Sequence, residues 1–560
     1  MLIQQSTQKG AVRYGAFFFA CLLCVLTAAL YLSFLGTPPF FDDLNFFKAV
    51  ALDTHREFYF TPRWGLRWLM GQIYESYGHG PEAFRILSLT IHLLTGLAVF
   101  FFVRRLLDTA GFDGHSSFAA FAGTLLFLLH PVATFAVGYI IQNTILSAML
   151  FSVLAWHAWL HGVLSGRARW LYVSALLFFL ACFSKEHAVT GLAIVVLLSI
   201  WLARSGLPGV HPGAMRLHLA AAGLLIGLVA IAIVLGQMGI FFIPYEPEVS
   251  YIVDELSVDR GLVYPISVLT QLGLFFKYLL LWLVPNTAWM SLDMREPFVQ
   301  SLYSWRHLAA VAGFLAYVGV GLTLLWRGGR MGLVGVALLT PALMFATEVS
   351  TARIQDAFVL YRTYLWLPVP FALAVALIVV RIRLRLSAAV LALVATFLAL
   401  FSINQLMTFS QPVFIWQQAL TALEGKPKLL GVDRIHHNLG QAYYDLGMAN
   451  EAMKHYDRAI QIAPDIPYSY VNRGALYYDL KRYDEAMADF DRSLSMMASG
   501  NAFMGRAMVL ESLGDREGET RALLAACGRK FIAACKKLEA RGATITTAGP
   551  DNPAVPAGGT

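Results

Sequence analysis

The sequence predicts an all-α membrane protein, in which a polytopic bundle of about eleven transmembrane helices is followed by a C-terminal solenoid of helical repeats. Two observations predict this class. First, 58% of the residues are apolar and 14% are charged, whereas a soluble globular domain has about 45–50% apolar and about 25% charged residues. Second, the apolar residues form runs that can cross a hydrocarbon core of about 30 Å as helices, whereas the chain beyond residue 410 is charged and repetitive.

The first domain, 1–410, carries the expected spans. The first run is not a signal peptide, because it has no small-residue cleavage site and many further apolar runs follow it. The expected spans are 13–35, 84–107, 116–133, 139–162, 170–184, 187–204, 217–243, 306–326, 331–348, 365–381 and 386–407.

The orientation follows from the Lys and Arg residues of the short loops, which favour the cytoplasmic side. Five basic clusters share one side if the N-terminus is cytoplasmic, which places the loops 36–83, 244–305 and 349–364 outside. Segment 263–284 is apolar enough to span, but a crossing there would turn two basic clusters outward. We therefore expect it to be re-entrant or interfacial at the outer face.

The second domain, 433–540, resembles tetratricopeptide repeats. Two 34-residue units start near Asp433 and Pro467, and a third, degenerate unit starts near Gly500. Gly440 and Gly474 let paired helices approach closely. The positions that match the repeat pattern are His436, Leu439, Gly440, Tyr443, Ala452, Tyr456, Ala459 and Pro464, then Tyr470, Gly474, Tyr477, Ala486 and Phe490. The tail 541–560, rich in Gly, Ala, Thr and Pro, is expected to be disordered.

Charge and cysteine content exclude several functions. The net charge of +7 reflects topology-setting loops, so no nucleic-acid partner is expected. Cys21 and Cys24 lie inside a span, which argues against a redox or zinc role. Cys527 and Cys535 lie eight residues apart on one expected helix and could pair only if that helix breaks, so we expect them to be free.

An acidic motif, Phe41-Asp42-Asp43, opens the first outer loop. Adjacent carboxylates repel each other, so one can keep a raised pKa and act as a base near neutral pH. On local sequence alone, an aspartate that caps the following helix is the stronger interpretation. Two carboxylates could also bind a divalent cation, but two ligands are too few to define a metal site, and no metal is assigned.

The acidic motif and five later segments together resemble the membrane glycosyltransferases of the C-type (GT-C) superfamily. The closest likeness is to transmembrane and tetratricopeptide-repeat-containing protein O-mannosyltransferases and their bacterial relatives. The segments are 84–94, ending in His92-Leu93-Leu94; His130-Pro131-Val132; Phe183-Ser184-Lys185-Glu186-His187-Ala188; Leu283-Val284-Pro285 followed by Leu292-Asp293; and 355–365, with Arg362-x-Tyr364-Leu365. The chain departs from the family pattern at Phe135 and Asn143, where Glu and Arg are usual, and in the reversed order Pro62-Arg63.

The resemblance implies an inverting glycosyltransferase with a polyprenyl-phosphate-linked sugar as donor and a periplasmic protein hydroxyl or glycan as acceptor. It places Asp42 as the base, with Asp43 as the rival, and Lys185 and Arg362 on the lipid phosphate. It also implies a bacterial inner membrane, with a cytoplasmic N-terminus and a periplasmic repeat domain that binds the acceptor or a partner. The remaining substrate-binding candidates are Arg63, His92, Glu186, Asp293 and Asp356.

Each candidate also has an ordinary structural interpretation. Lys185 and Arg362 could anchor spans at the membrane surface, His92 could be a bundle hydrogen-bonding residue, and Asp293 and Asp356 could cap short helices. The alternative function is a non-enzymatic membrane scaffold that recruits partners through its repeats. A transporter is a weaker alternative, because the clearest charges lie at span ends instead of at mid-membrane.

Overall fold

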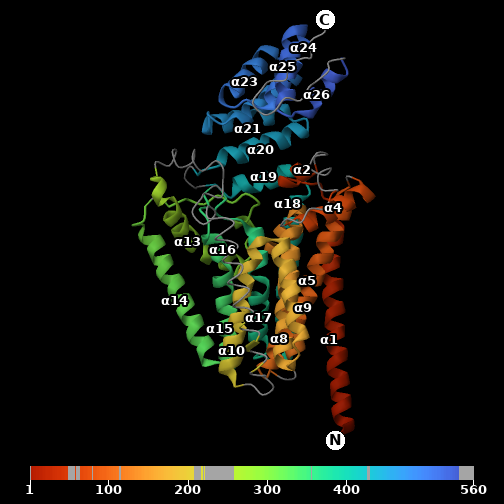
Figure 1. Ribbon diagram of the computed structural model, residues 1–560, viewed down its shortest axis with the longest axis vertical. Coiled ribbons are helices and arrows are strands. Elements are labelled where there is room, and N and C mark those ends of the chain that lie inside the picture. Colours follow the sequence, from red (N-terminus) through yellow and green to blue (C-terminus); the bar gives the residue numbers. More distant parts are fainter. Residues whose placement is uncertain are drawn as a thin grey trace. The chain divides into compact units, whose positions relative to one another are not determined.

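The computed structural model describes residues 2–47, 57, 63–78, 80–112, 115–206, 213, 216–217, 220, 258–299, 301–354, 356–424 and 429–541. The chain divides into a membrane unit, Met1–Gln411, and a repeat unit, Pro412–Thr560 (Figure 1). Over the described residues the structure is helical, and an isolated antiparallel bridge joins Met294 and Phe358. The protein is therefore a polytopic helical bundle followed by a helical repeat solenoid.

The membrane unit is built from long apolar helices joined by short turns. Their bounds are α1 Leu2–Tyr31, α4 Trp64–Tyr77, α5 Pro81–Thr109, α6 Ser116–Leu128, α7 Pro131–Val137, α8 Asn143–Ser165, α9 Arg169–Ser184, α10 Leu192–Ser205, α13 Val263–Leu283, α14 Trp305–Arg327, α15 Gly329–Met344, α16 Ala346–Val349, α17 Pro368–Val379 and α18 Leu384–Phe409. Short elements between them are α2 Asp42–Phe46, η1 Leu32–Phe34, η2 Ile140–Gln142, η3 Glu186–Gly191, η4 Arg260–Leu262, η5 Thr287–Trp289 and η6 Leu360–Leu365.

Proline and glycine set several helix ends. Pro81 and Pro368 open α5 and α17, where a residue without an N–H and with a fixed φ costs nothing. Gly166 and Gly206 end α8 and α10 with φ of 66° and 57°, a region that glycine enters without steric penalty.

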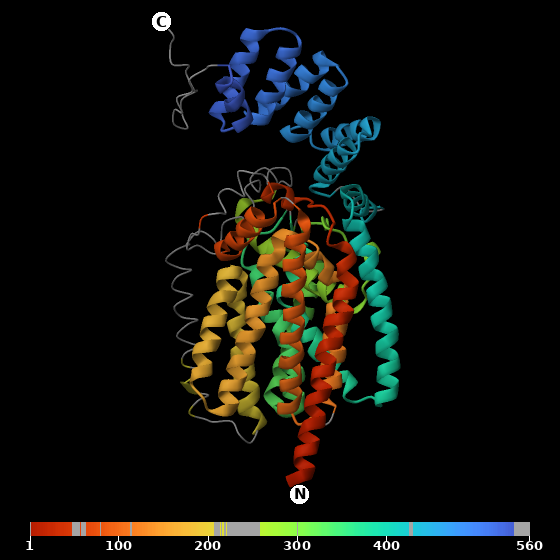
Figure 2. The ribbon, with the colours of Figure 1, turned by 90° about the vertical axis from the view of Figure 1, so that its right-hand side faces the viewer.

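Eight described helices are long and apolar enough to cross a membrane, or nine if the bent pair α6–α7 is one span. Each expected span except 217–243, most of which lies outside the described residues, coincides with one of these helices or with the shorter apolar helices α9 and α17. Both views place the α8–α9, α14–α15 and α17–α18 turns at the end of the bundle where α1 begins (Figure 2). This is the arrangement that the basic loops predict.

Helix α13 also passes the length and composition test for a span. In both views it lies toward the end of the bundle opposite the start of α1. Along its length it holds the 349–363 segment, through Tyr264 Oη to Val349 O (2.9 Å), Gln271 Nε2 to Ala357 O (2.7 Å) and Trp282 Nε1 to Thr363 Oγ1 (3.0 Å). By length and composition α13 is a candidate span, and the expectation that it does not cross the membrane stays a prediction.

The third span is broken by a bend of 63° between α6 and α7. Pro131 starts α7 after the break, and His130 caps it by accepting from the Val132 N–H (3.2 Å). The carbonyls freed by the break are satisfied: Leu128 O accepts from His92 Nε2 (3.3 Å) and Leu129 O from Ser402 Oγ (2.8 Å). A broken helix at membrane depth needs such partners.

The repeat unit is a row of helical hairpins. Its helices are α19 Pro412–Thr421, α20 Val432–Asp445, α21 Ala449–Ile462, α22 Pro467–Asp479, α23 Tyr483–Met496, α24 Gly500–Ser512, α25 Arg516–Gly528 and α26 Ile532–Glu539. A Cβ on Gly440 would come within 2.7 Å of the Tyr456 ring, and one on Gly474 within 3.0 Å of the Phe490 ring. The two glycines therefore allow the close helix pairing that the sequence predicts. The tail 542–560 lies outside the described residues.

The expectation that Cys527 and Cys535 are free is wrong, because they form a disulfide. The single helix expected there breaks between Gly528 and Ile532, with Lys530 at a φ of 62°. The break folds α26 back and brings the two Cα atoms to 4.9 Å, within the range that a disulfide spans.

Candidate functional site

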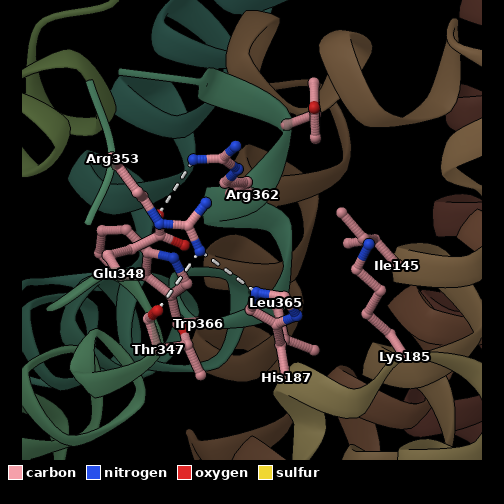
Figure 3. A pocket seen from close by; sticks show the side chains of 10 residues that line it. Ile145, Lys185, His187, Thr347, Glu348, Arg353, Arg362, Leu365 and Trp366 are labelled. Carbon is pink, nitrogen blue, oxygen red and sulfur yellow. Dashed lines mark hydrogen bonds and ion pairs between the residues drawn. The ribbon is translucent and has the colours of Figure 1, made fainter. Parts of the chain in front are cut away.

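A small charged cavity opens in the membrane unit where η3, α16 and η6 meet (Figure 3). Its volume is about 50 Å³. Since about 10–15 Å³ of such space holds one water, the cavity has room for a group the size of a few waters, such as a phosphate. The residues that line it are Ile145, Lys185, His187, Thr347, Glu348, Arg353, Tyr361, Arg362, Leu365 and Trp366.

Glu348 is the buried anion of the cavity and pairs with two arginines. Its Oε2 lies 3.2 Å from Arg353 Nε and 3.2 Å from Arg362 Nη1. The side chains of Glu348 and Arg353 are each 2% exposed. Arg353 Nη2 also reaches Thr347 O and His187 Nε2, both at 3.3 Å, and Arg362 Nη1 donates to Asp356 O (3.1 Å). The guanidinium groups are therefore held in place by α16, η3 and the 356–362 segment.

Lys185, at the junction of α9 and η3, lies across the cavity from Glu348 in the view of Figure 3. Burial, followed by the charges of the nearby Arg63, Arg362 and Arg353, lowers the pKa of Lys185 to about 8, while the charge of Glu186 acts in the opposite direction. Among the described residues, no carboxylate forms an ion pair with its ammonium.

Next to Lys185, Glu186 pairs with Arg63. Arg63 directly precedes α4, with a φ of 66°, and its N–H donates to Phe183 O (2.7 Å). Among the described residues that line the cavity, the three cations Lys185, Arg353 and Arg362 outnumber the one carboxylate, Glu348. Buried cations without a counter-charge are costly, so the arrangement favours an anion.

The acidic loop does not form the expected N-cap. The residue before α2 is Phe41, and no side chain caps the helix. Asp43 is instead fully buried and accepts from the N–H groups of Ile141 (2.8 Å) and Ile140 (3.2 Å). Burial raises the pKa of Asp43 to about 7, although the Ile141 N–H and the Arg85 charge act in the opposite direction.

Asp42 is only half-buried and lies beside Tyr139, whose hydroxyl accepts from the Asp42 N–H (3.2 Å). Burial, followed by the charges of Asp42 and Asp43, raises the pKa of Tyr139 well above its ordinary value. The Tyr139 ring contacts the ring of Tyr361 at 5.7 Å, and Tyr361 lines the cavity. Two aromatic rings therefore connect the acidic loop with the basic cavity.

The other predicted residues lie outside the cavity lining. His92 is buried between Tyr364 Oη (2.6 Å from Nδ1) and Leu128 O. Asp293 is buried in an ion pair with Arg295 (2.6 Å). Asp356 contributes its backbone carbonyl to Arg362. Of the nine candidates, Lys185 and Arg362 share the cavity, and Arg63 and Glu186 pair beside it.

The sequence reasoning missed Glu348, Arg353, His187 and the tyrosines 139 and 361. A usable signal was present for one of them: Glu348 is a carboxylate at the end of an apolar span, and ionisable residues at such positions are functional candidates by default. Within the described parts of the chain, no group of three or more His, Cys, Asp and Glu side chains could hold a metal ion.

Comparison with known proteins identifies the repeats. A family model described as TPR repeat matches residues 440–481, and one described as Tetratricopeptide repeat matches residues 467–496. No curated protein matches the chain. The C-terminal unit therefore contains tetratricopeptide repeats, which indicate binding to other proteins.

Proposed function

We propose that the membrane unit is an inverting glycosyltransferase of the GT-C type. It moves a sugar from a polyprenyl-phosphate-linked donor to a periplasmic protein hydroxyl or glycan. The observation that carries this proposal is the cavity, which is lined by the cations Lys185, Arg353 and Arg362 and by a single carboxylate, that of Glu348.

The donor phosphate fits the excess positive charge. Arginine guanidinium groups bind phosphate oxygens in pairs of parallel hydrogen bonds, and lysine adds a mobile point charge. Glu348 fixes the two arginines in position before the donor arrives, so less side-chain freedom is lost on binding.

The acidic loop supplies the base. Asp42 accepts the proton of the acceptor hydroxyl while the acceptor oxygen bonds to the anomeric carbon. The bond from that carbon to the phosphate oxygen breaks on the opposite side, which inverts the carbon, and its electron pair leaves with the polyprenyl phosphate. Asp43, whose oxygens are occupied by two backbone N–H groups, is a positioning residue that ties α2 to η2.

We further propose that the repeat unit lies in the periplasm and binds the acceptor or a partner, while the N-terminus is cytoplasmic. The disulfide between Cys527 and Cys535 supports this side of the membrane, because disulfides persist in oxidising compartments such as the periplasm. A bacterial inner membrane offers such a compartment on its outer side.

The proposal is tested by transfer from a panel of radiolabelled polyprenyl-phosphate sugars in membranes that contain the full chain. Wild type should label protein or glycan, and Asp42→Asn should lose transfer at unchanged expression. Asp259→Asn is the matched control, since Asp259 is an exposed carboxylate that caps η4. Full activity of both Asp42→Asn and Asp43→Asn would exclude the mechanism.

A second candidate function is a membrane scaffold, which the match of residues 440–496 to tetratricopeptide repeats favours. A scaffold needs its repeat surface and not its acidic loop. Full cellular function of Asp42→Asn, together with loss of function on deletion of residues 432–541, would favour the scaffold.

A further inference from the structure

A second basic cluster lies at the end of the membrane unit where α1 begins. It gathers Arg105 near the end of α5, His161 near the end of α8, and Arg167, Arg169 and Trp170 in the α8–α9 turn and the first turn of α9. These helices pack as neighbours, α5 against α8 and α8 against α9. The cluster is separate from the cavity, which is formed by η3, α16 and η6 near the opposite end (Figure 1).

Trp170 makes the side-chain contacts within this cluster. The His161 ring meets the edge of the Trp170 ring at 4.7 Å, and the Arg169 guanidinium lies 5.8 Å from the Trp170 ring centre. Arg167 and Arg169 are exposed, so their charges are open to a ligand that approaches from outside the bundle.

Two donors in this cluster are unsatisfied. Arg105 Nε and Trp170 Nε1 are buried atoms without a hydrogen-bond partner in the part of the chain that the structure describes. The nearest acidic residue on α5, Asp108, is already engaged with Arg104 (3.7 Å) and with the Ser116 hydroxyl. A buried donor without an acceptor costs about 1–3 kcal/mol, so a ligand with acceptor oxygens and negative charge would relieve both defects.

We propose that this cluster binds the headgroup of an anionic phospholipid. The phosphate accepts hydrogen bonds from Arg105 Nε and Trp170 Nε1, and Arg167 and Arg169 add charge from the rim. The acyl chains run along α9, where Tyr172, Val173 and Leu176 are exposed apolar side chains that continue from Trp170 into the membrane. Basic pockets between helix ends and interfacial tryptophans are both typical of headgroup contacts.

The ordinary interpretation is that these arginines only set the topology. That role needs charge and does not need buried donors without a hydrogen-bond partner. The loop between α17 and α18 provides the comparison, because Arg383 and Arg385 are exposed basic residues at the same end of the bundle. A site and a topology signal can therefore be separated with variants of equal charge.

The test is a lipid titration of the purified full chain in phosphatidylcholine nanodiscs, with bound phosphatidylglycerol counted by native mass spectrometry. Arg105→Lys keeps the charge and the topology but removes Nε, and Trp170→Phe keeps the ring but removes the N–H. Each should weaken phosphatidylglycerol binding about fivefold, because one hydrogen bond to the phosphate is lost while the charge of the cluster is kept. Arg383→Lys and Arg385→Lys should change nothing.

Equal weakening in the Arg383→Lys and Arg385→Lys controls would overturn the proposal, because the attraction would then be general. Unchanged binding in both Arg105→Lys and Trp170→Phe would also overturn it. Competition with inorganic phosphate distinguishes a lipid headgroup from a soluble phosphate as the ligand. If it displaces phosphatidylglycerol at equal concentration, the ligand is a soluble anion and the lipid proposal fails.

Discussion

The repeat unit and the cavity of the membrane unit differ in how many carboxylates pair with their cations. In the repeat unit, Arg473 is held by two carboxylates, with Nε and Nη2 on Asp489 (2.8 and 2.7 Å) and Nη1 on Asp457 (2.7 Å). In the cavity one carboxylate, Glu348, is shared by two arginines, and within the described parts of the chain no carboxylate forms an ion pair with Lys185. A cation with full compensation stabilises a fold, whereas an excess of cations prepares a site for an anion.

The two regions also differ in how far apart their partners lie in the sequence. Arg473 finds both carboxylates 16 residues away, one repeat helix before and after it. Around the cavity, Glu348 lies close in the sequence to Arg353 and Arg362, but Arg63 pairs with Glu186 and Arg353 with His187 across 123 and 166 positions. Changes in the repeats should therefore affect local stability, and changes in the cavity should affect function.

The largest expected effect comes from exchanging a cation for a neutral side chain in each region. Lys185→Met should lower transfer about 10²–10³-fold, because an electrostatic contact to the reacting group is lost. It should leave the unfolding temperature of the membrane unit unchanged or raised, since an uncompensated buried charge is removed. Arg473→Met should instead destabilise the repeat unit by about 2–3 kcal/mol, because it leaves the buried Asp489 carboxylate unpaired.

Both variants are measured on the full chain, by transfer from the lipid-linked donor and by hydrogen exchange over residues 432–541. The comparison breaks if Lys185→Met destabilises its unit as strongly as Arg473→Met does. Lys185 would then be a structural anchor and not a donor-binding residue.

A smaller effect on stability is expected from the disulfide that links α26 to α25. Replacing both Cys527 and Cys535 with Ser removes a short loop constraint worth about 2–3 kcal/mol in the chain-entropy model. Hydrogen exchange of the backbone amides in α26 should become faster. The ion pairs of Lys537, and of Arg541 just after the helix, with Glu519 (3.1 and 2.8 Å) remain in the variant. Cys182→Ser, a free cysteine of the membrane unit, is the control. Wild type in reductant should behave as the double variant does, and a difference between them would contradict this effect of the disulfide.

What could be predicted from the sequence follows the same division. The repeats can be predicted because the contacts that define them are local. Gly440, for example, accommodates the ring of Tyr456, which belongs to the same repeat. The spans can be predicted because hydropathy is a property of each local segment. The cavity could not be predicted, because nothing near Lys185 in the sequence indicates that Arg353 and Glu348 fold against it. The disulfide was missed for a local reason, the turn after Gly528, where Lys530 adopts a positive φ that its residue type does not predict.

The smallest expected effect is a pH dependence of opposite sign in the two regions. In the repeat unit, burial lowers the pKa of His437 to about 4, where its ring bonds Ser469 Oγ (3.0 Å). At a pH below about 6.5, the ordinary pKa of histidine, His437 binds a proton in the unfolded chain, whereas in the folded unit it stays neutral until the pH reaches about 4. The stability that His437 contributes is therefore complete above about pH 6.5 and is lost as the pH falls toward 4, by about 1–2 kcal/mol at pH 5.

Donor binding in the cavity should weaken at high pH instead. The Lys185 ammonium is present below its pKa of about 8 and is lost as the pH rises through that value, so donor binding should weaken there. His437→Gln should reduce the acid sensitivity of exchange over residues 432–541 without changing donor binding, while the lowered pKa values of His436 and His455, caused by burial, keep part of it. Lys185→Met should do the reverse. If both sensitivities move together in either variant, the two regions are coupled and the division drawn between a charge-compensated fold and a charge-rich site does not hold.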